Sequence, residues 1–361
     1  TTGDDAYGLY LWSSKSDTLT LTGDITTTGY ASHGVYLESS QSNITTITGN
    51  ISTLGDWSDG LDLRNSISNT IDMMGNITTT MKDSNAIYLY ESDNNTITLR
   101  GDLTTTKGWA RGLYLNYSDS NNVAITGNIN TNGANYDASL GCSGGCNYSH
   151  GLLMRNSLNN TISINGDINI MGQTAHGLHL DLSDNNTINL TGDISTIEYL
   201  SDGLFFYDSD SNTTNLTGNI TTKGNNSDGL SLERSNYNTT NLTGDITTTG
   251  DGSHLYGANG LFLHNSNYNT TNITGNITTT GDGSHGLALF RSDNNTINMT
   301  GDITTTGYAS HGLYLYECCG FFRGDSNIIN LTGSLSAKGA NSYAIYAEST
   351  SDNNTITFNQ G

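Results

Sequence analysis

A repeat of 26 residues constrains the fold of this chain more than any other feature. Each repeat carries a glycine followed by Asp, Asn or Ser and then by Ile or Leu. These anchor glycines are Gly23, Gly49, Gly75, Gly101, Gly127, Gly166, Gly192, Gly218, Gly244, Gly275, Gly301 and Gly333. Of the eleven intervals between them, eight are 26 residues and the others are 39, 31 and 32. A period broken only by additions is typical of a solenoid, whose loops grow while its rungs keep their length.

Each repeat contains three short runs in which apolar and polar residues alternate. In one repeat the apolar positions are Ile97, Leu99, Leu103, Leu113 and Leu115. Alternation with a period of two predicts β-strands with one buried face. The sequence therefore predicts an all-β, single-domain parallel β-helix over 1–361, with about 13 rungs of 26 residues and three strands per rung. Insertions are expected at about 134–147, 254–259 and 318–323.

Two recurring corners support this prediction. A glycine before the third strand is expected where the backbone is left-handed or where no Cβ fits; it recurs at Gly34, Gly60, Gly112, Gly151, Gly177, Gly203, Gly229, Gly260, Gly286 and Gly312. At the Asn-Asn-Thr corner we expect the first Asn to stack its amide from rung to rung. The first Asn of this corner recurs at Asn94, Asn159, Asn185, Asn294 and Asn353.

The amino-acid composition limits the kinds of partner that the protein can bind. The net charge is −22, only 13% of residues are charged, and proline is absent. Abundant Gly, Ser, Thr and Asn disfavour helices. The negative charge gives no electrostatic basis for binding nucleic acid, and no apolar run is long enough for a membrane-spanning helix. We therefore expect no nucleic-acid partner and no direct membrane insertion.

The repeats resemble a known class of surface proteins. The runs GDITTTGYASHGLYL and GDGSHGLALFRSDNNTINMTGDITTTG are similar to repeats in the passenger regions of bacterial autotransporters and related right-handed β-helix adhesins. The resemblance implies a secreted β-helix displayed on a cell surface, and it carries over no catalytic residue. These 361 residues depart from that class in two ways, because they include no membrane-barrel translocator and because they contain four cysteines.

The two ends of the chain are complementary in the phase of the repeat. The first residues match the middle of a rung, and the last residues match a first strand. Unpaired strand edges favour pairing with another chain. We therefore expect self-association, head to tail through the open solenoid ends, as an open filament. The alternative is a window of a longer autotransporter-type adhesin.

The cysteines all lie in the insertions. Cys142 and Cys146 lie in the sequence GCSGGC, while Cys318 and Cys319 are adjacent. We expect local disulfides, which suit an oxidising extracellular compartment. A zinc half-site at the first pair and a bridge between subunits are the alternatives.

Stacked rungs turn each outward position into a column. The centre of the third strand carries Tyr10, Tyr36, Tyr88, Tyr114, Tyr314 and Tyr346, interrupted by other residue types. Aromatic side chains at a spacing of about 4.8 Å are expected mainly to pack on one another. The functional alternative is a contact strip for glycans or for a neighbouring fibre.

The turn before that strand has a mixed polar column. His150 with His176, and His285 with His311, lie on adjacent rungs, but the mixed composition favours a polar turn over a metal site. Asp202 and Asp228 have the spacing of a glycosidase pair, yet no large insertion builds a cleft over them. The sequence therefore predicts no enzyme and no cofactor. Calcium on the Asp and Asn residues that follow the anchor glycines is the alternative.

Glycosylation sequons are dense. The corner residues Asn94, Asn185, Asn294 and Asn353 are the candidate glycosylation sites, because corners have room for a glycan. An outward column of Asn189, Asn215, Asn241, Asn272, Asn298 and Asn330 is too crowded for full occupancy. Outward threonine pairs such as Thr304 and Thr306 resemble ice-binding arrays, but interruptions favour plain strand propensity.

Together these features predict a non-enzymatic, extracellular structural protein. It would be a glycoprotein and the subunit of a head-to-tail filament or surface fibre, with an adhesive role toward surface glycans. The alternative is a carbohydrate-binding or carbohydrate-cleaving β-helix of adhesin or tailspike type.

Overall fold

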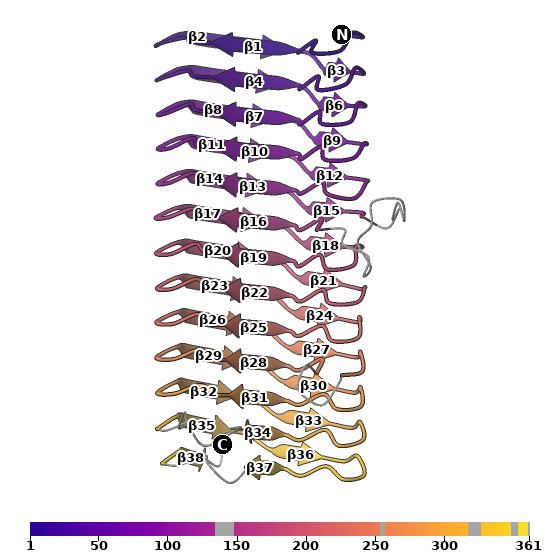
Figure 1. The fold of residues 1–361 in the computed structure, drawn as a ribbon, viewed down its shortest axis with the longest axis vertical. Coiled ribbons are helices and arrows are strands. Elements are labelled where there is room, and N and C mark those ends of the chain that lie inside the picture. Colours follow the sequence, from indigo (N-terminus) through magenta and orange to yellow (C-terminus); the bar gives the residue numbers. More distant parts are fainter. Residues whose placement is uncertain (134–147, 253–256, 317–325, 348–352, 360–361) are drawn as a thin grey trace. The chain divides into compact units, whose positions relative to one another are not determined.

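The structure, a computed structural model, describes residues 1–133, 148–252, 257–316, 326–347 and 353–359. Regular structure in these ranges consists of β-strands without any helix. The described part of the chain accordingly holds no helix that could cross a membrane. The chain divides into two compact units, one of residues 1–176 with 181–191 and one of residues 177–180 with 192–361. In each unit the rungs contribute strands to three parallel sheets, named A, B and C (Figure 1).

In the first unit each rung passes through sheets A, B and C in that order. Sheet A contains β1 (Leu9–Trp12), β4 (Val35–Glu38), β7 (Leu61–Arg64), β10 (Ile87–Tyr90), β13 (Leu113–Asn116) and β16 (Leu152–Arg155). Sheet B contains β2 (Thr18–Thr22), β5 (Ile44–Thr48), β8 (Thr70–Met74), β11 (Thr96–Arg100), β14 (Asn122–Thr126), β17 (Thr161–Asn165) and β20 (Thr187–Thr191). Sheet C contains β3 (Ile25–Thr27), β6 (Ile51–Thr53), β9 (Ile77–Thr79), β12 (Leu103–Thr105), β15 (Ile129–Thr131) and β18 (Ile168–Ile170).

The second unit repeats this arrangement. Sheet A contains β19 (Leu178–Asp181), β22 (Leu204–Tyr207), β25 (Leu230–Glu233), β28 (Leu261–His264), β31 (Leu287–Phe290), β34 (Leu313–Tyr316) and β37 (Ile345–Ala347). Sheet B contains β23 (Thr213–Thr217), β26 (Thr239–Thr243), β29 (Thr270–Thr274), β32 (Thr296–Thr300), β35 (Ile328–Thr332) and β38 (Thr355–Asn359). Sheet C contains β21 (Ile194–Thr196), β24 (Ile220–Thr222), β27 (Ile246–Thr248), β30 (Ile277–Thr279), β33 (Ile303–Thr305) and β36 (Leu335–Ala337).

The predicted fold class, an all-β parallel β-helix with three strands per rung, is confirmed. Equivalent residues pair across rungs in the predicted register, as Ile97 with Val123 in sheet B and Leu103 with Ile129 in sheet C. The five apolar positions predicted for one repeat are all buried, each at most 1% exposed. Each rung therefore adds the same small set of apolar side chains to the core of its unit.

Polar ladders close the corners of the rungs, and one of them lies one residue later than predicted. Asn94 and its equivalents are exposed, and Asn94 has a left-handed backbone with φ of 57°. The buried amide ladder is formed by the next residue instead. Asn69 donates from its backbone N–H to Asn95 Oδ1 at 2.9 Å, and from Nδ2 at 3.1 Å. The prediction that the first Asn stacks was wrong, because the left-handed turn points its side chain toward solvent.

The glycine before each sheet A strand is required by close packing. A Cβ on Gly60 would lie 2.1 Å from Ile77 Cγ2 and 2.6 Å from the carbonyl oxygen of Ala86. Of the two reasons predicted for this glycine, the lack of room for a Cβ is therefore the one that holds. In the next rung Ala86 takes the place of the glycine, and the residue facing it by the same offset is Leu103. Leu103 has no Cγ2, so the contact that a Cβ on Gly60 would make with Ile77 is absent from that rung. A facing leucine is not sufficient by itself, because a Cβ on Gly312 would lie 2.5 Å from Leu335 Cδ1.

This pairing of glycine with isoleucine predicts the result of a double-mutant cycle. Gly60→Ala is expected to destabilise the protein by about 2 kcal/mol, because its Cβ overpacks against Ile77. Ile77→Leu in the same chain should recover part of that loss, since it removes the Cγ2 contact but leaves the 2.6 Å approach to the carbonyl oxygen of Ala86. Urea unfolding of both single variants and the double variant measures the coupling. Simple addition of the two single effects would contradict the explanation.

Candidate functional site

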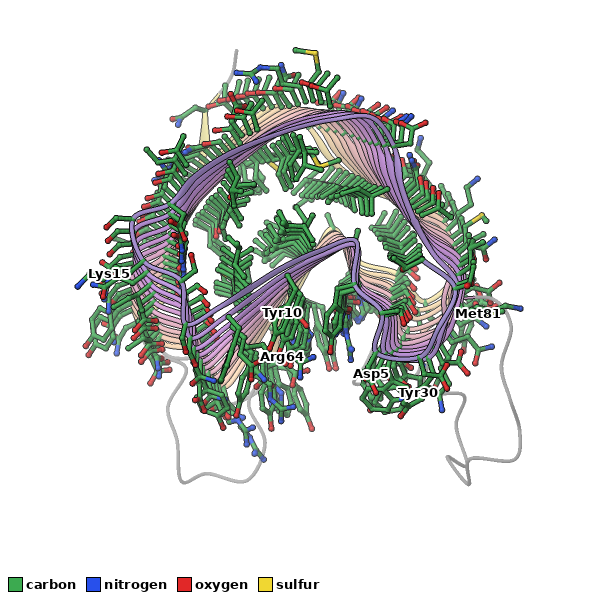
Figure 2. The ribbon with its side chains drawn as sticks, turned by 90° about the horizontal axis from the view of Figure 1, so that it is seen from above. Asp5, Tyr10, Lys15, Tyr30, Arg64 and Met81 are labelled. Carbon is green, nitrogen blue, oxygen red and sulfur yellow. The ribbon has the colours of Figure 1, made fainter. Side chains whose placement is uncertain are left out.

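The side chains on the outer face of sheet A form the candidate site, named the groove face. It comprises three neighbouring columns. The first holds the turn residue just before the corner glycine, the second holds the central residue of the sheet A strand, and the third holds the last residue of that strand. In the first unit Tyr10 and Arg64 point to the same side of sheet A, between the corner with Lys15 and the corner with Asp5 and Tyr30 (Figure 2). Side chains of different columns therefore meet on this face.

The predicted tyrosine strip forms the central column and is mostly buried. Tyr36, Tyr114 and Tyr314 are between 7% and 9% exposed, whereas Tyr10 is 42% exposed. The ring centroids of Tyr88 and Tyr114 are 4.9 Å apart and nearly parallel, and those of Tyr314 and Tyr346 are 5.6 Å apart. The rings thus pack on one another, as expected. Any ligand would meet the edges of these rings and the more exposed aromatic residues beside them.

The mixed turn column is a hydrogen-bond ladder. Asp59 donates its backbone N–H to His33 Nδ1 at 3.0 Å, and Asn85 donates its own to Asp59 Oδ1 at 2.6 Å. In the second unit His311 donates in the same way to His285 Nδ1 at 2.9 Å. His, Asp and Asn are interchangeable here because each has an acceptor at the same distance from the backbone. The polar turn interpretation therefore accounts for the His, Asp and Asn residues of the column.

A buried ionic cluster lies next to this ladder in the first unit. Asp62 interrupts the tyrosine column and is completely buried, with Arg64 Nε 2.9 Å and His33 Nε2 3.3 Å from its Oδ2. Burial lowers the pKa of His33 to about 3, so the ring is neutral at pH 7. Since its Nδ1 accepts a hydrogen bond, the proton sits on Nε2 and faces Asp62. This tautomer leaves His33 no lone pair for a metal ion.

Burial raises the pKa of both carboxyl groups of the cluster. Burial raises the pKa of Asp59 to about 6, while Arg64 and the hydrogen bonds from Asn85 act in the opposite direction. Burial and the charge of Asp59 raise the pKa of Asp62 well above its usual range, and Arg64 opposes this shift. The cluster thus holds Arg64 in place on the groove face.

A pocket of about 360 Å³ opens on the groove face beside this cluster. Its lining combines aromatic rings with charged and amide groups, and consists of Trp57, Asp59, Arg64, Asp83, Asn85, Tyr88, Tyr90, Arg111 and Tyr114. Trp57 is 53% exposed, and Tyr90 is half-buried. A concave site with apolar rings and a few polar groups is the usual form of a small-molecule site.

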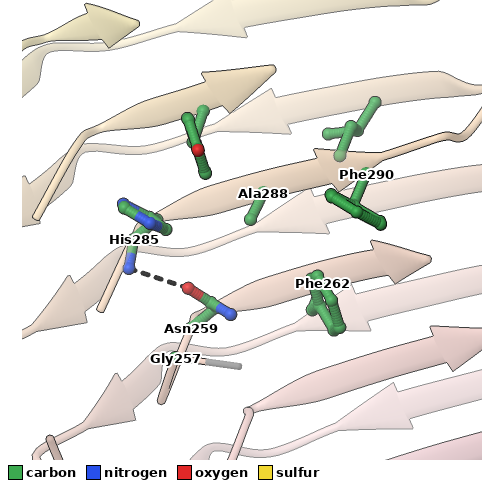
Figure 3. Close-up of a pocket in the computed structure, with 8 residues that line it drawn as sticks. Gly257, Asn259, Phe262, His285, Ala288 and Phe290 are labelled. Atoms are coloured by element: carbon green, nitrogen blue, oxygen red, sulfur yellow. Dashed lines mark hydrogen bonds between the residues drawn. The ribbon is translucent and has the colours of Figure 1, made fainter. Parts of the chain in front are cut away.

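A smaller cavity lies on the groove face of the second unit. Ala288 stands between Phe262 and Tyr314 in the central column, and the missing ring leaves a cavity of about 10 Å³ (Figure 3). His285 lies at its edge and donates its backbone N–H to Asn259 Oδ1 at 2.8 Å. This volume holds about one water molecule, so of these two cavities only the one in the first unit has room for a small ligand.

The other predicted residues do not line either of these two cavities. Asp202 and Asp228 belong to the turn ladder and are 6% and 7% exposed, with the Asp228 N–H donating to Asp202 Oδ1 at 2.7 Å. The candidate glycosylation sites are exposed, and they are Asn94, Asn185, Asn294 and Asn353. The four cysteines, Cys142, Cys146, Cys318 and Cys319, lie outside the described residues.

The crowded asparagine column of sheet B is a second amide ladder. In the second unit Asn241 Nδ2 donates to Asn215 Oδ1 at 2.8 Å, and Asn272 Nδ2 donates to Asn241 Oδ1 at 2.7 Å. Nδ2 is the atom that an N-linked glycan would modify. Glycosylation there would replace one of the two hydrogens of a ladder donor, which adds a chemical constraint to the predicted steric one.

Comparisons with known proteins identify no relative of this chain. Nothing matches it among protein-family models, curated proteins or solved structures. Function is therefore argued from the residues of the site alone.

Four residues that line the pocket were not predicted from the sequence. They are Trp57, Tyr90, Asp83 and Arg64. Each lies in a column whose composition looks unremarkable by itself, and the pocket exists only where columns from three rungs meet. Reading the turn and strand columns together over 57–114, rather than one at a time, would have shown aromatic and charged residues gathering at these rungs.

Proposed function

We propose that the chain is a non-enzymatic, extracellular structural protein of the surface-fibre type, whose groove face binds carbohydrate. Membership of the autotransporter-like adhesins is part of this proposal. The observation that carries it is the pocket in which Trp57 and Tyr90 lie beside Asp59, Asn85 and Arg111. Aromatic faces suit the apolar faces of sugar rings, while carboxylate, amide and guanidinium groups suit their hydroxyl groups.

The size and setting of the pocket favour a saccharide over a large partner. About 360 Å³ lies within the range of small-ligand sites. The lining groups are also held in place before a ligand arrives. Arg64 is fixed by Asp62, and Asn85 donates both its backbone N–H and Nδ2 to Asp59 Oδ1. Rigid polar groups lose little entropy on binding.

The rest of the solenoid supplies a scaffold for such a site. Ladders of backbone and side-chain hydrogen bonds repeat in each rung and leave the outer positions free to vary. Self-association along the fibre stays a prediction, which electron microscopy of the purified protein would test.

The proposal predicts that two aromatic residues of the pocket are required for glycan binding. On a glycan array, the labelled chain should bind at least one class of oligosaccharide, and Trp57→Asn and Tyr90→Asn should each weaken that binding at least tenfold. Both substitutions have natural precedents in the chain. Asn226 has the same left-handed turn as Trp57, with φ of 52° against 58°, and Asn116 pairs with Tyr90 in the next rung.

A matched control is an exposed tyrosine outside the pocket. Tyr237 is 60% exposed and lies at the corner position occupied by Asn94 in another rung, with φ of 57° at both. Tyr237→Asn should leave glycan binding unchanged. Equal loss in all three variants, or no loss in the two pocket variants, would refute the assignment of the pocket.

A further inference from the structure

The gap in the tyrosine column at Asp62 is flanked by two rings that hold an arginine. Asp62 pairs with Tyr36 in the preceding rung and with Tyr88 in the following rung. The guanidinium carbon of Arg64 lies 5.8 Å from the ring centroid of Tyr36 and 5.6 Å from that of Tyr88. A cation within about 6 Å of an aromatic ring is attracted to its face. Both rings beside the gap therefore restrain the position of the Arg64 guanidinium.

The hydrogen bond of Arg64 uses one end of its guanidinium and leaves the other end open. Nε donates to Oδ2 of the completely buried Asp62 at 2.9 Å. In the described part of the chain neither Nη atom donates a hydrogen bond to protein, and both are open to solvent. The Arg64 side chain is 38% exposed, lines the pocket, and pairs with Tyr90 in the next rung. Arg64 thus presents the donors of a rigid fork beside a ring proposed to contact the sugar.

The charges around the pocket are matched within the protein. In addition to the Arg64 ion pair, Lys82 Nζ lies 3.7 Å from Asp83 Oδ2. Arg111 interacts electrostatically with Asp83 and Asp59. A charged ligand would bring a charge that has no opposite charge left to pair with, and a buried unpaired charge is strongly unfavourable. The open donors of Arg64 are therefore better suited to neutral oxygen acceptors.

We propose that Arg64, held in place by Asp62, determines the specificity of the pocket for a neutral sugar, whose two adjacent hydroxyl groups accept hydrogen bonds from Nη1 and Nη2. This inference rests on the proposed function, because it names the class of glycan that the same pocket takes. Adjacent hydroxyl oxygens on a pyranose ring provide two neighbouring acceptors, which match the two Nη donors. Asp62 acts through Arg64 and is therefore a positioning residue.

The first part of the test identifies the sugar with small probes. NMR titration would measure the binding of the methyl glycosides of glucose, mannose and galactose, and of the anionic methyl glycoside of galacturonic acid. We expect at least one neutral probe to bind, and the galacturonic acid probe to bind no more tightly than the galactose probe. Deoxy analogues of the best neutral probe should show one pair of adjacent hydroxyl groups, and loss of either should weaken binding at least tenfold.

The second part asks whether Arg64 is the source of this preference for the parent sugar over its deoxy analogues. The double variant Asp62→Tyr with Arg64→Asn copies the natural combination of Tyr114 and Asn116 in another rung. It should bind the parent sugar and both deoxy analogues within twofold of one another. Asp62→Asn, which keeps an oxygen acceptor for Nε without the charge, should retain part of the preference. A merely structural role of Asp62 would not change this ratio.

A matched control is another arginine that is paired in the same way outside the pocket. Arg234 Nη2 donates to Asp208 at 2.8 Å, and its guanidinium carbon lies 4.3 Å from the ring centroid of Tyr207. Asn265 has the same left-handed corner conformation, with φ of 50° against 49°. Arg234→Asn should therefore keep the full preference for the parent sugar. Circular dichroism and urea unfolding would verify that each variant folds.

The outcomes separate this inference from the function on which it rests. Tighter binding of the galacturonic acid probe than of the galactose probe would overturn the selectivity for neutral sugars. A preference for the parent sugar that persists in the double variant would overturn the role of Arg64. Failure of all four probes to bind to a chain that still binds on the glycan array would overturn this inference alone. Failure of the probes together with an empty array would overturn both proposals.

Discussion

Replacing Asn295 by alanine is expected to destabilise the second unit by about 3–5 kcal/mol, one of the two largest effects predicted for this chain. Asn295 is completely buried in the amide ladder. Its Oδ1 accepts the backbone N–H of Asn269 at 2.8 Å, and its Nδ2 donates to the carbonyl oxygen of Ser266 at 2.8 Å. Alanine would leave both of these buried backbone groups without a partner.

The preceding residue supplies the control. Asn294 is exposed and has a left-handed backbone with φ of 57°, which glycine adopts without strain. Asn294→Gly should change stability by less than about 0.5 kcal/mol. The two variants differ by one position in the sequence, so urea unfolding midpoints compare them directly. Similar losses in both would mean that the ladder is not the source of corner stability.

The second large effect is a gain in stability from removing two buried charges. Asp202 and Asp228 are adjacent members of the turn ladder, and the Asn259 N–H donates to Asp228 Oδ1 at 2.6 Å. Burial raises the pKa of both carboxyl groups well above the usual range; Glu233 raises both further, and Asp202 also raises that of Asp228. Asparagine keeps the accepting Oδ1 and has no charge, as Asn259 itself shows in the same column.

The sign of the pH dependence follows from these raised pKa values. The folded chain holds the two protons more tightly than the unfolded chain, so stability is greatest below the usual pKa of Asp and falls as pH rises toward the folded pKa values. The double variant Asp202→Asn with Asp228→Asn should be about 2–4 kcal/mol more stable than the wild type at pH 7. At about pH 3 the difference should largely vanish, because the wild-type groups are then mostly protonated in both states.

An exposed ladder residue serves as the matched control for this pair. Asp245 also accepts a backbone N–H from the next rung, that of Asn276 at 2.7 Å, but it lies on the surface. Asp245→Asn should therefore have little effect on the pH dependence of unfolding. If the double variant is less stable than the wild type at pH 7, the two carboxylates contribute as charges, and the account of the ladder as neutral acceptors is wrong.

The period of the chain was enough to predict the fold. The spacing of the anchor glycines and the alternation of residues such as Leu113 and Leu115 fix the number of strands per rung and the face that each side chain takes. These features are local and repeat in every rung, so a single correct register predicts all columns. The sequence also predicted that the tyrosines pack on each other.

The sequence could not predict how the columns use their polar groups. Asn94 and Asn95 are the same residue type, and only the left-handed turn at Asn94 decides that Asn95 forms the buried ladder. Likewise, Asp62 interrupts the tyrosine column and Arg64 was not singled out from the sequence. The contacts of Asp62 with Arg64 and with His33 depend on how far side chains reach between columns and rungs. The pocket depends on such contacts and was therefore missed.

The most direct test of the central claim is a structure of the chain bound to the oligosaccharide that binds best on the array. The account predicts one sugar ring against Trp57 and Tyr90, with hydrogen bonds from its hydroxyl groups to polar groups of the pocket such as Asn85. A saccharide bound at another face of the solenoid, such as the threonine pairs of sheet C, would contradict the claim that the groove face is the functional site.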